Sequence, residues 1–236
     1  MIAAPPPPPT LALSASPARV ALVGAARQNI RVRNAGAEPV VVVAGRAGYA
    51  IDLLGRPRLS SEAPAPWLRL TPTRVTVPAG GTVTLTVASL PAPGTSPGDH
   101  YALALLTSRS RGGSGVAVRT RIGIVVSLRM RGRVVHRLAL RSLRAHGSGR
   151  TRVLTLTVAN RGNIAERFRG SRISLHRGSR LLTRLWPQAR ELLPRTARVA
   201  RVRCPARLHG WVTAVVELLL IEPNRPTITR RFRLRL

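Results

Sequence analysis

Apolar residues recur at every second position over long stretches of the chain, and this pattern limits the fold more than any other feature of the sequence. Val83, Leu85 and Val87 alternate with threonines. A longer run keeps one parity, with Thr120 as its only polar member, and its apolar members are Val116, Val118, Ile122, Ile124, Val126 and Leu128. An apolar period of two indicates half-buried β-strands. Clusters of turn-forming residues separate such runs, at 78–81, 91–98 and 111–115, which is typical of an all-β sandwich.

Signals in the first half of the chain return in the second half in the same order. An alternating strand that ends in Asn-x-Gly occurs at 30–36 and again at 156–162. An apolar residue followed by proline then leads into a further strand, at 77–78 and at 193–194. The offset is roughly 115–125 residues, about the length of one immunoglobulin-like sandwich. We therefore expect an all-β protein with two tandem immunoglobulin-like β-sandwich domains.

The predicted organisation has three parts. Residues 1–9 read MIAAPPPPP, and successive prolines favour an extended polyproline II tether. Residues 10–128 form the first sandwich and residues 129–236 the second. Residues 181–193 depart from the strand pattern, and we expect a short helix or an irregular connection there.

Residues able to carry out catalysis are few and scattered. The 8 carboxylates and 5 histidines stand in no acid–base, nucleophile or metal-ligand motif. A single cysteine, Cys204, excludes an intramolecular disulfide and a cysteine-rich zinc site, and we expect a buried, inert thiol. We therefore expect no enzyme, no cofactor and no bound metal.

Positive charge is concentrated in the second half of the chain. The 39 basic residues, all arginine, exceed the 8 acidic ones by 31. Residues 1–125 hold 13 arginines and 4 acids (+9), and residues 126–236 hold 26 and 4 (+22). Strand parity predicts two outward rows of arginine, which are Arg201 with Arg203, and Arg231 with Arg233 and Arg235. Such rows suit polyanions, because arginine binds phosphate in bidentate fashion. The alternatives are a solvated face, an edge protected from unwanted pairing, and codon bias in a GC-rich genome.

Motifs in both halves resemble those of a known group of bacterial proteins. Five residues near the end of the 67–80 segment fit its first motif: Pro72, Val75, Val77, Pro78 and Gly80. A Pro-Gly-x-Tyr strand opening follows at Pro97, Gly98 and Tyr101, and Asn160-Arg161-Gly162-Asn163 fits the signature of the second domain. On these residues the chain resembles the WxL-interacting type of Gram-positive cell-surface protein and, more distantly, the periplasmic pilus-chaperone sandwiches.

The resemblance implies a secreted or surface-anchored protein without catalytic activity. The leading hypothesis is therefore an extracellular or cell-surface binding protein whose partner is another surface protein or an anionic cell-wall polymer. No signal peptide is visible in this chain, and no apolar run reaches the roughly 20 residues that a transmembrane helix needs.

Two alternatives remain open. One is a pilus-chaperone-like protein that donates the strand 116–128 to an incomplete subunit. Its apolar knobs are Val116, Val118, Ile122, Ile124 and Val126. Such chaperones anchor the subunit's terminal carboxylate with a basic pair, for which Arg119 and Arg121 are available. The other alternative is a polyanion or nucleic-acid binder that uses the basic second domain, with nucleic acid possible but not favoured.

Overall fold

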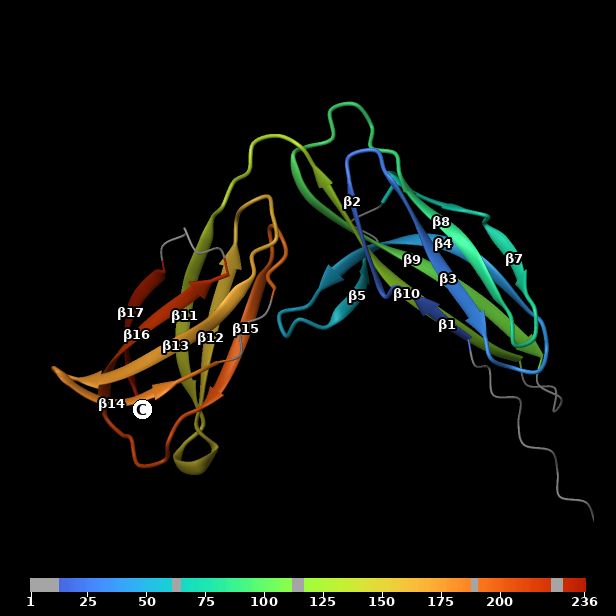
Figure 1. Ribbon diagram of the computed structural model, residues 1–236. Helices are drawn as coiled ribbons and strands as arrows, with labels where there is room; N and C mark the ends of the chain where they lie inside the picture. Colours follow the sequence, from blue (N-terminus) through green and yellow to red (C-terminus); the bar gives the residue numbers. More distant parts are fainter. Residues whose placement is uncertain (1–12, 61–64, 112–116, 188–190, 222–226) are drawn as a thin grey trace, which may run out of the picture. The chain divides into compact units, whose positions relative to one another are not determined.

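The computed structural model describes residues 13–60, 65–111, 117–187, 191–221 and 227–236, and these form strands almost throughout (Figure 1). The prediction of an all-β, two-sandwich protein is confirmed. One compact unit contains the described residues up to Ala50 together with Arg58–Gly132, and the other contains Ile51–Pro57 and Arg133–Leu236. The described chain contains no helix with the length and apolar character that crossing a membrane requires.

The first unit is built from two sheets. Its strands are β1 (Leu13–Ser16), β2 (Arg19–Val23), β3 (Arg27–Asn34), β4 (Val40–Ile51), β5 (Pro57–Ser60), β6 (Leu68–Thr71), β7 (Arg74–Val77), β8 (Thr82–Ser89), β9 (Gly98–Arg111) and β10 (Ala117–Met130). One sheet has the order β1-β3-β8-β6, and the other has the order β2-β10-β9-β4-β5, with β7 beside β4. The chain changes sheet between β1 and β2, where the Ser16–Pro17 peptide bond is cis.

Alternation in the sequence explains the core of this unit. Ile30 and Leu85 from one sheet pack in the same apolar cluster as Leu106 and Ile124 from the other, and each side chain is at most 1% exposed. Burial of such a side chain contributes roughly 1.5–3 kcal/mol relative to its exposure. The threonines of β8 lie on the opposite, outer face, as the alternating pattern predicts.

The second unit has the same two-layer construction. Its strands are β11 (Leu138–His146), β12 (Val153–Asn160), β13 (Phe168–Arg177), β14 (Arg180–Leu185), β15 (Ala197–Arg203), β16 (Trp211–Leu220) and β17 (Ile228–Arg235), with a 3-10 turn at Gly149–Thr151. The sheets have the orders β11-β12-β15 and β14-β13-β16-β17, and every pairing is antiparallel (Figure 1). Leu154 and Leu156 of the first sheet and Ile173 and Val216 of the second are fully buried.

Two boundaries of the sequence prediction need comment. Residues 181–185 belong to β14, which pairs with β13, so the expected helix is wrong for this part of 181–193. The strand reads RLLTRL, and its polar and apolar residues do not follow a period of two, so the sequence does not indicate a strand here. The predicted domain limits at 128 and 129 lie within β10. We propose instead that the first domain ends at Gly132 and the second begins at Arg133, where the two compact units divide. The tether at 1–9 lies outside the described residues.

Candidate functional site

The edge of β10 that faces β2 is paired over only part of its length. Parallel β2 pairs its residues 19–23 with residues 125–129 of β10. The opposite edge of β10 pairs with β9 along 117–130. Within the described chain, no strand pairs with the β2-side edge over residues 117–124. We call this stretch the open edge of β10.

The backbone groups at the open edge belong to odd-numbered residues. The Val125 N–H donates to the Ala18 carbonyl oxygen at 3.2 Å, and the Arg129 carbonyl oxygen accepts from the Gly24 N–H at 3.0 Å. Backbone groups alternate between the two edges of a strand, so the N–H and C=O groups of Arg121 and Gly123 also point to the β2 side. They are therefore available to a further strand.

The side chains of β10 change their exposure along the strand. Val126 and Leu128 are fully buried, and Ile124 is 1% exposed. Ile122 and Thr120 lie on the same face but are only half-buried, so this end of the strand leaves apolar surface for a partner to cover. Arg119 and Arg121 lie on the opposite, outer face and are exposed.

The five residues predicted to donate differ in whether the open edge of β10 includes them. Val116 lies outside the described residues, and only the backbone of Val118 is described, opposite Ser110 of β9. Ile122 and Ile124 lie on the open edge. Val126 is opposite Val20 of β2, so its part of the edge is already occupied. The role of all five as donor knobs stays a prediction.

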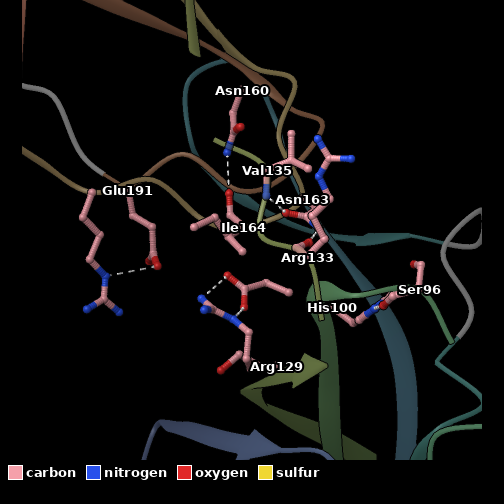
Figure 2. Close-up of polar contacts among 12 residues, drawn as sticks. Ser96, His100, Arg129, Arg133, Val135, Asn160, Asn163, Ile164 and Glu191 are labelled. Atoms are coloured by element: carbon pink, nitrogen blue, oxygen red, sulfur yellow. Dashed lines mark hydrogen bonds and ion pairs between the residues drawn. The ribbon is translucent and has the colours of Figure 1, made fainter. Parts of the chain in front are cut away.

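Polar contacts join β9 and β10 near Asp99 and Arg129, at the end of the pair away from the open edge. The Arg129 Nη2 donates to the Asp99 Oδ2 at 2.9 Å, and the Asp99 side chain is only 7% exposed. His100 Nε2 lies 2.8 Å from the Ser96 carbonyl oxygen (Figure 2). These contacts hold local backbone and side chains together at the turn before β9.

The two predicted arginine rows lie on outer faces, as strand parity required. Arg201 and Arg203 are exposed on β15. Arg231, Arg233 and Arg235 are exposed on β17, where Leu234 points into the core. The Arg233 guanidinium lies 5.0 Å from the ring centroid of Trp211. Binding of a polyanion by either row stays a prediction.

Sequence reasoning missed an arginine-lined depression on the outer face of the β11-β12-β15 sheet. It has a volume of about 460 Å³, and its lining includes Arg141, Arg161, Arg195 and Thr157. We call it the arginine hollow. Arg161 belongs to the Asn-x-Gly element, but Arg141 and Arg195 come near it only through strand pairing. No local motif could have grouped these three residues.

Other ionisable groups form structural contacts. Burial raises the pKa of the Cys204 thiol, while the nearby Arg152 guanidinium acts in the opposite direction. The thiol is buried, as the sequence predicted, and its inertness stays a prediction. The buried carboxylate of Glu166 lies 3.0 Å from His136 Nδ1. Among the described residues, no three His, Cys, Asp or Glu side chains gather in a way that could hold a metal ion.

Comparisons with known proteins give matches in structure alone. No model of a known protein family matches the chain, and no curated protein matches its sequence. The YadV chaperone is similar in structure, with a TM-score of 0.51 at 17% identity over 94% of this chain and 98% of that chain. The class 5 fimbriae chaperone CfaA has a TM-score of 0.56 at 11% identity over 93% and 98%. A chain of the Salmonella enterica complex of SafA pilin with the SafB chaperone has a TM-score of 0.50 at 12% identity over 94% and 97%.

At such identities the likeness shows the fold alone. It supports two β-sandwiches arranged in sequence as in pilus chaperones. The pilus-chaperone part of the sequence resemblance is therefore supported, whereas its WxL-interacting part receives no support.

Proposed function

We propose that this protein is a non-enzymatic chaperone of the bacterial cell envelope that binds a pilus-type subunit. The observation that carries the proposal is the open edge of β10, where backbone groups are available beside half-buried Thr120 and Ile122. Addition of a strand to such an edge gives affinity through backbone hydrogen bonds and specificity through alternate side chains. The structurally similar proteins are chaperones by name, which supports this alternative over the cell-surface binding protein that we expected first.

The proposal narrows the donated segment. The predicted strand 116–128 includes residues 125–128, which β2 already pairs. We therefore propose that residues 117–124 donate their backbone groups, with the half-buried Ile122 covering apolar surface of the subunit, because Ile124 is already buried in the core of this protein. The exposed Arg119 and Arg121 then remain the candidates for anchoring a carboxylate of the subunit, because guanidinium groups bind carboxylates in bidentate geometry.

A proline at the open edge tests this proposal. Proline lacks the backbone N–H but is tolerated where that N–H faces solvent. We expect Arg121→Pro to lower recovery of a co-expressed pilin-type subunit by roughly fivefold or more, because one unmade backbone bond costs about 1 kcal/mol or more. Gly123→Pro should act in the same way, since its N–H also points to the open edge. Quantitative pull-down from the periplasm measures the effect.

Arg121→Ala is the matched control, because it removes the side chain and keeps the N–H. It should lower the recovery of the subunit less than Arg121→Pro does. Circular dichroism and thermal melts identify proline variants that retain the fold. If folded proline variants recover as much subunit as the wild type, the open edge is not the donor and the proposal fails.

A further inference from the structure

The outer face of the β11-β12-β15 sheet carries arginine and no acid. The three strands contain no aspartate and no glutamate. Leu154, Leu156 and Val158 of the central strand point into the core, so Thr155 and Thr157 point outward. We call the outward surface of these strands, including the arginine hollow, the basic face. It lies on the second unit, and the open edge of β10 lies on the first.

Guanidinium groups at the arginine hollow have no partner in the described chain. Arg141, Arg161 and Arg195 line the hollow, and no hydrogen bond or ion pair joins their side chains to a described residue. Elsewhere in this unit, arginines near carboxylates are paired: Arg172 with Glu217 and Arg167 with Glu191. No carboxylate lines the hollow. Three unneutralised cations around one concavity favour an anion within it.

The shape of the hollow also favours a ligand. Its lining includes the small outward residues Thr157, Ala159 and Ala197 of the sheet, which leave room for a group of several oxygen atoms between the longer arginines. Arg195 has a φ of 56°, the only positive φ among the described non-glycine residues. Backbone held in this region by an ordinary side chain is often found where a ligand binds.

Positive charge continues from the hollow along the sheet. Arg201 and Arg144 flank Thr155 on its two neighbouring strands, and Arg203 follows Arg201 on the same face about 6.7 Å further along. The distance from Ala197, at the hollow, to Arg203 is about 20 Å along β15. A single anion fills only the hollow, whereas a linear polymer reaches the remaining arginines.

The composition of the basic face narrows the class of polymer. β11, β12 and β15 contain no phenylalanine, tyrosine or tryptophan. Proteins that bind single-stranded nucleic acid stack its bases on aromatic side chains. We propose that the basic face binds a linear polyanion of phosphate or sulfate groups without aromatic bases, with one group in the arginine hollow and the following groups at Arg144, Arg201 and Arg203.

Binding of linear inorganic polyphosphate at low salt tests the proposal. The triple variant Arg141→Gln, Arg161→Gln, Arg195→Gln should raise the Kd for polyphosphate at least about tenfold, because each substitution removes one charge-assisted contact. The matched control is Arg27→Gln, Arg31→Gln, Arg33→Gln, which removes the same charge from exposed positions on β3 of the first unit and should change the Kd less than about threefold. The slope of log Kd against log salt should be smaller in the hollow variant than in the wild type, because fewer contacts release fewer counterions. Equal loss in both variants would show a general charge effect and overturn the site.

Two further ligands identify the class and the source of the anion. Heparin, a sulfated glycan, should show the same difference between the two variants, as polyphosphate does. Single-stranded DNA of equal charge should bind more weakly than polyphosphate, and tighter DNA binding would overturn the proposed class. Arg121→Pro should bind polyphosphate like the wild type, so failure of the subunit proposal leaves this result unaffected.

Discussion

Two buried asparagines hold comparable turns in the two units. Asn34 and Asn160 end β3 and β12, and each is 1% exposed. The Asn160 Nδ2 donates to the carbonyl oxygens of Ile164 at 2.7 Å (Figure 2) and of Leu192 at 3.1 Å, and its Oδ1 accepts from the Gly162 N–H at 2.8 Å. Asn34 bonds to Glu38 O and Gly36 N–H in the same way. The asparagine of the sequence motif therefore stabilises the backbone of the turn in both units.

Asn160→Ala should lower the free energy of unfolding by about 2–3 kcal/mol. The substitution leaves buried backbone groups without partners, and each such group costs about 1–3 kcal/mol. Chemical denaturation followed by circular dichroism measures the loss. Asn29→Ala is the control, because Asn29 is exposed and accepts only the Thr86 hydroxyl bond at 3.1 Å. An equally small loss in both variants would contradict the structural role of Asn160.

For individual elements, the sequence predicts where strands lie better than it predicts which strand edges stay unpaired. Alternation at 82–87 and 116–128 is local, so the parity of Leu85, Ile124 and the arginines of β17 could be read directly. Which edge of β10 stays open depends on where β2 begins to pair, about a hundred residues away in the chain. That information resides in register and topology, and the arginine hollow depends on the same kind of long-range pairing.

A cross-strand ion pair on β13 and β16 makes a separate prediction about pH. Hydrogen bonds from the Arg172 guanidinium lower the pKa of Glu217, and the charges of Arg172 and Arg184 act in the same direction. The two bonds are 2.6 Å and 2.9 Å long. Because the pKa is lower in the folded state, the carboxylate stabilises the fold above its unfolded pKa of about 4.3. That stabilisation is lost as the pH falls through the folded pKa.

Glu217→Gln should therefore melt at a lower temperature than the wild type at pH 6–7, and the two should converge below about pH 4. Thermal melts across this pH range measure the difference. In an Arg172→Gln background, Glu217→Gln should change the melting temperature much less at neutral pH, since the partner is gone. A difference that persists unchanged at pH 3 would show that Glu217 acts through packing.

For the whole molecule, the net charge of +31 acts at two levels. Repulsion among arginines opposes the compact state and is screened by any salt. A defined anion site instead responds to the ligand that fits it and stabilises the folded state by mass action. The sequence supplied the total charge and its excess in the second half, but the total could not distinguish these two effects. Because the basic face is a defined set of residues, substitutions there separate the effect of an anion site from that of the overall charge.

Millimolar pyrophosphate at constant ionic strength should raise the melting temperature of the wild type by several degrees. A ligand at ten times its Kd stabilises the fold by about 1.4 kcal/mol, and 1 kcal/mol shifts the melting temperature of a domain of this size by roughly 4–8 °C. Arg141→Gln, Arg161→Gln, Arg195→Gln should lose this shift and keep the response to sodium chloride. The β3 triple variant, Arg27→Gln, Arg31→Gln, Arg33→Gln, should keep both responses. Equal shifts in all three proteins would mean that pyrophosphate acts only on the overall charge, because both variants carry the same net charge and differ only in where it was removed.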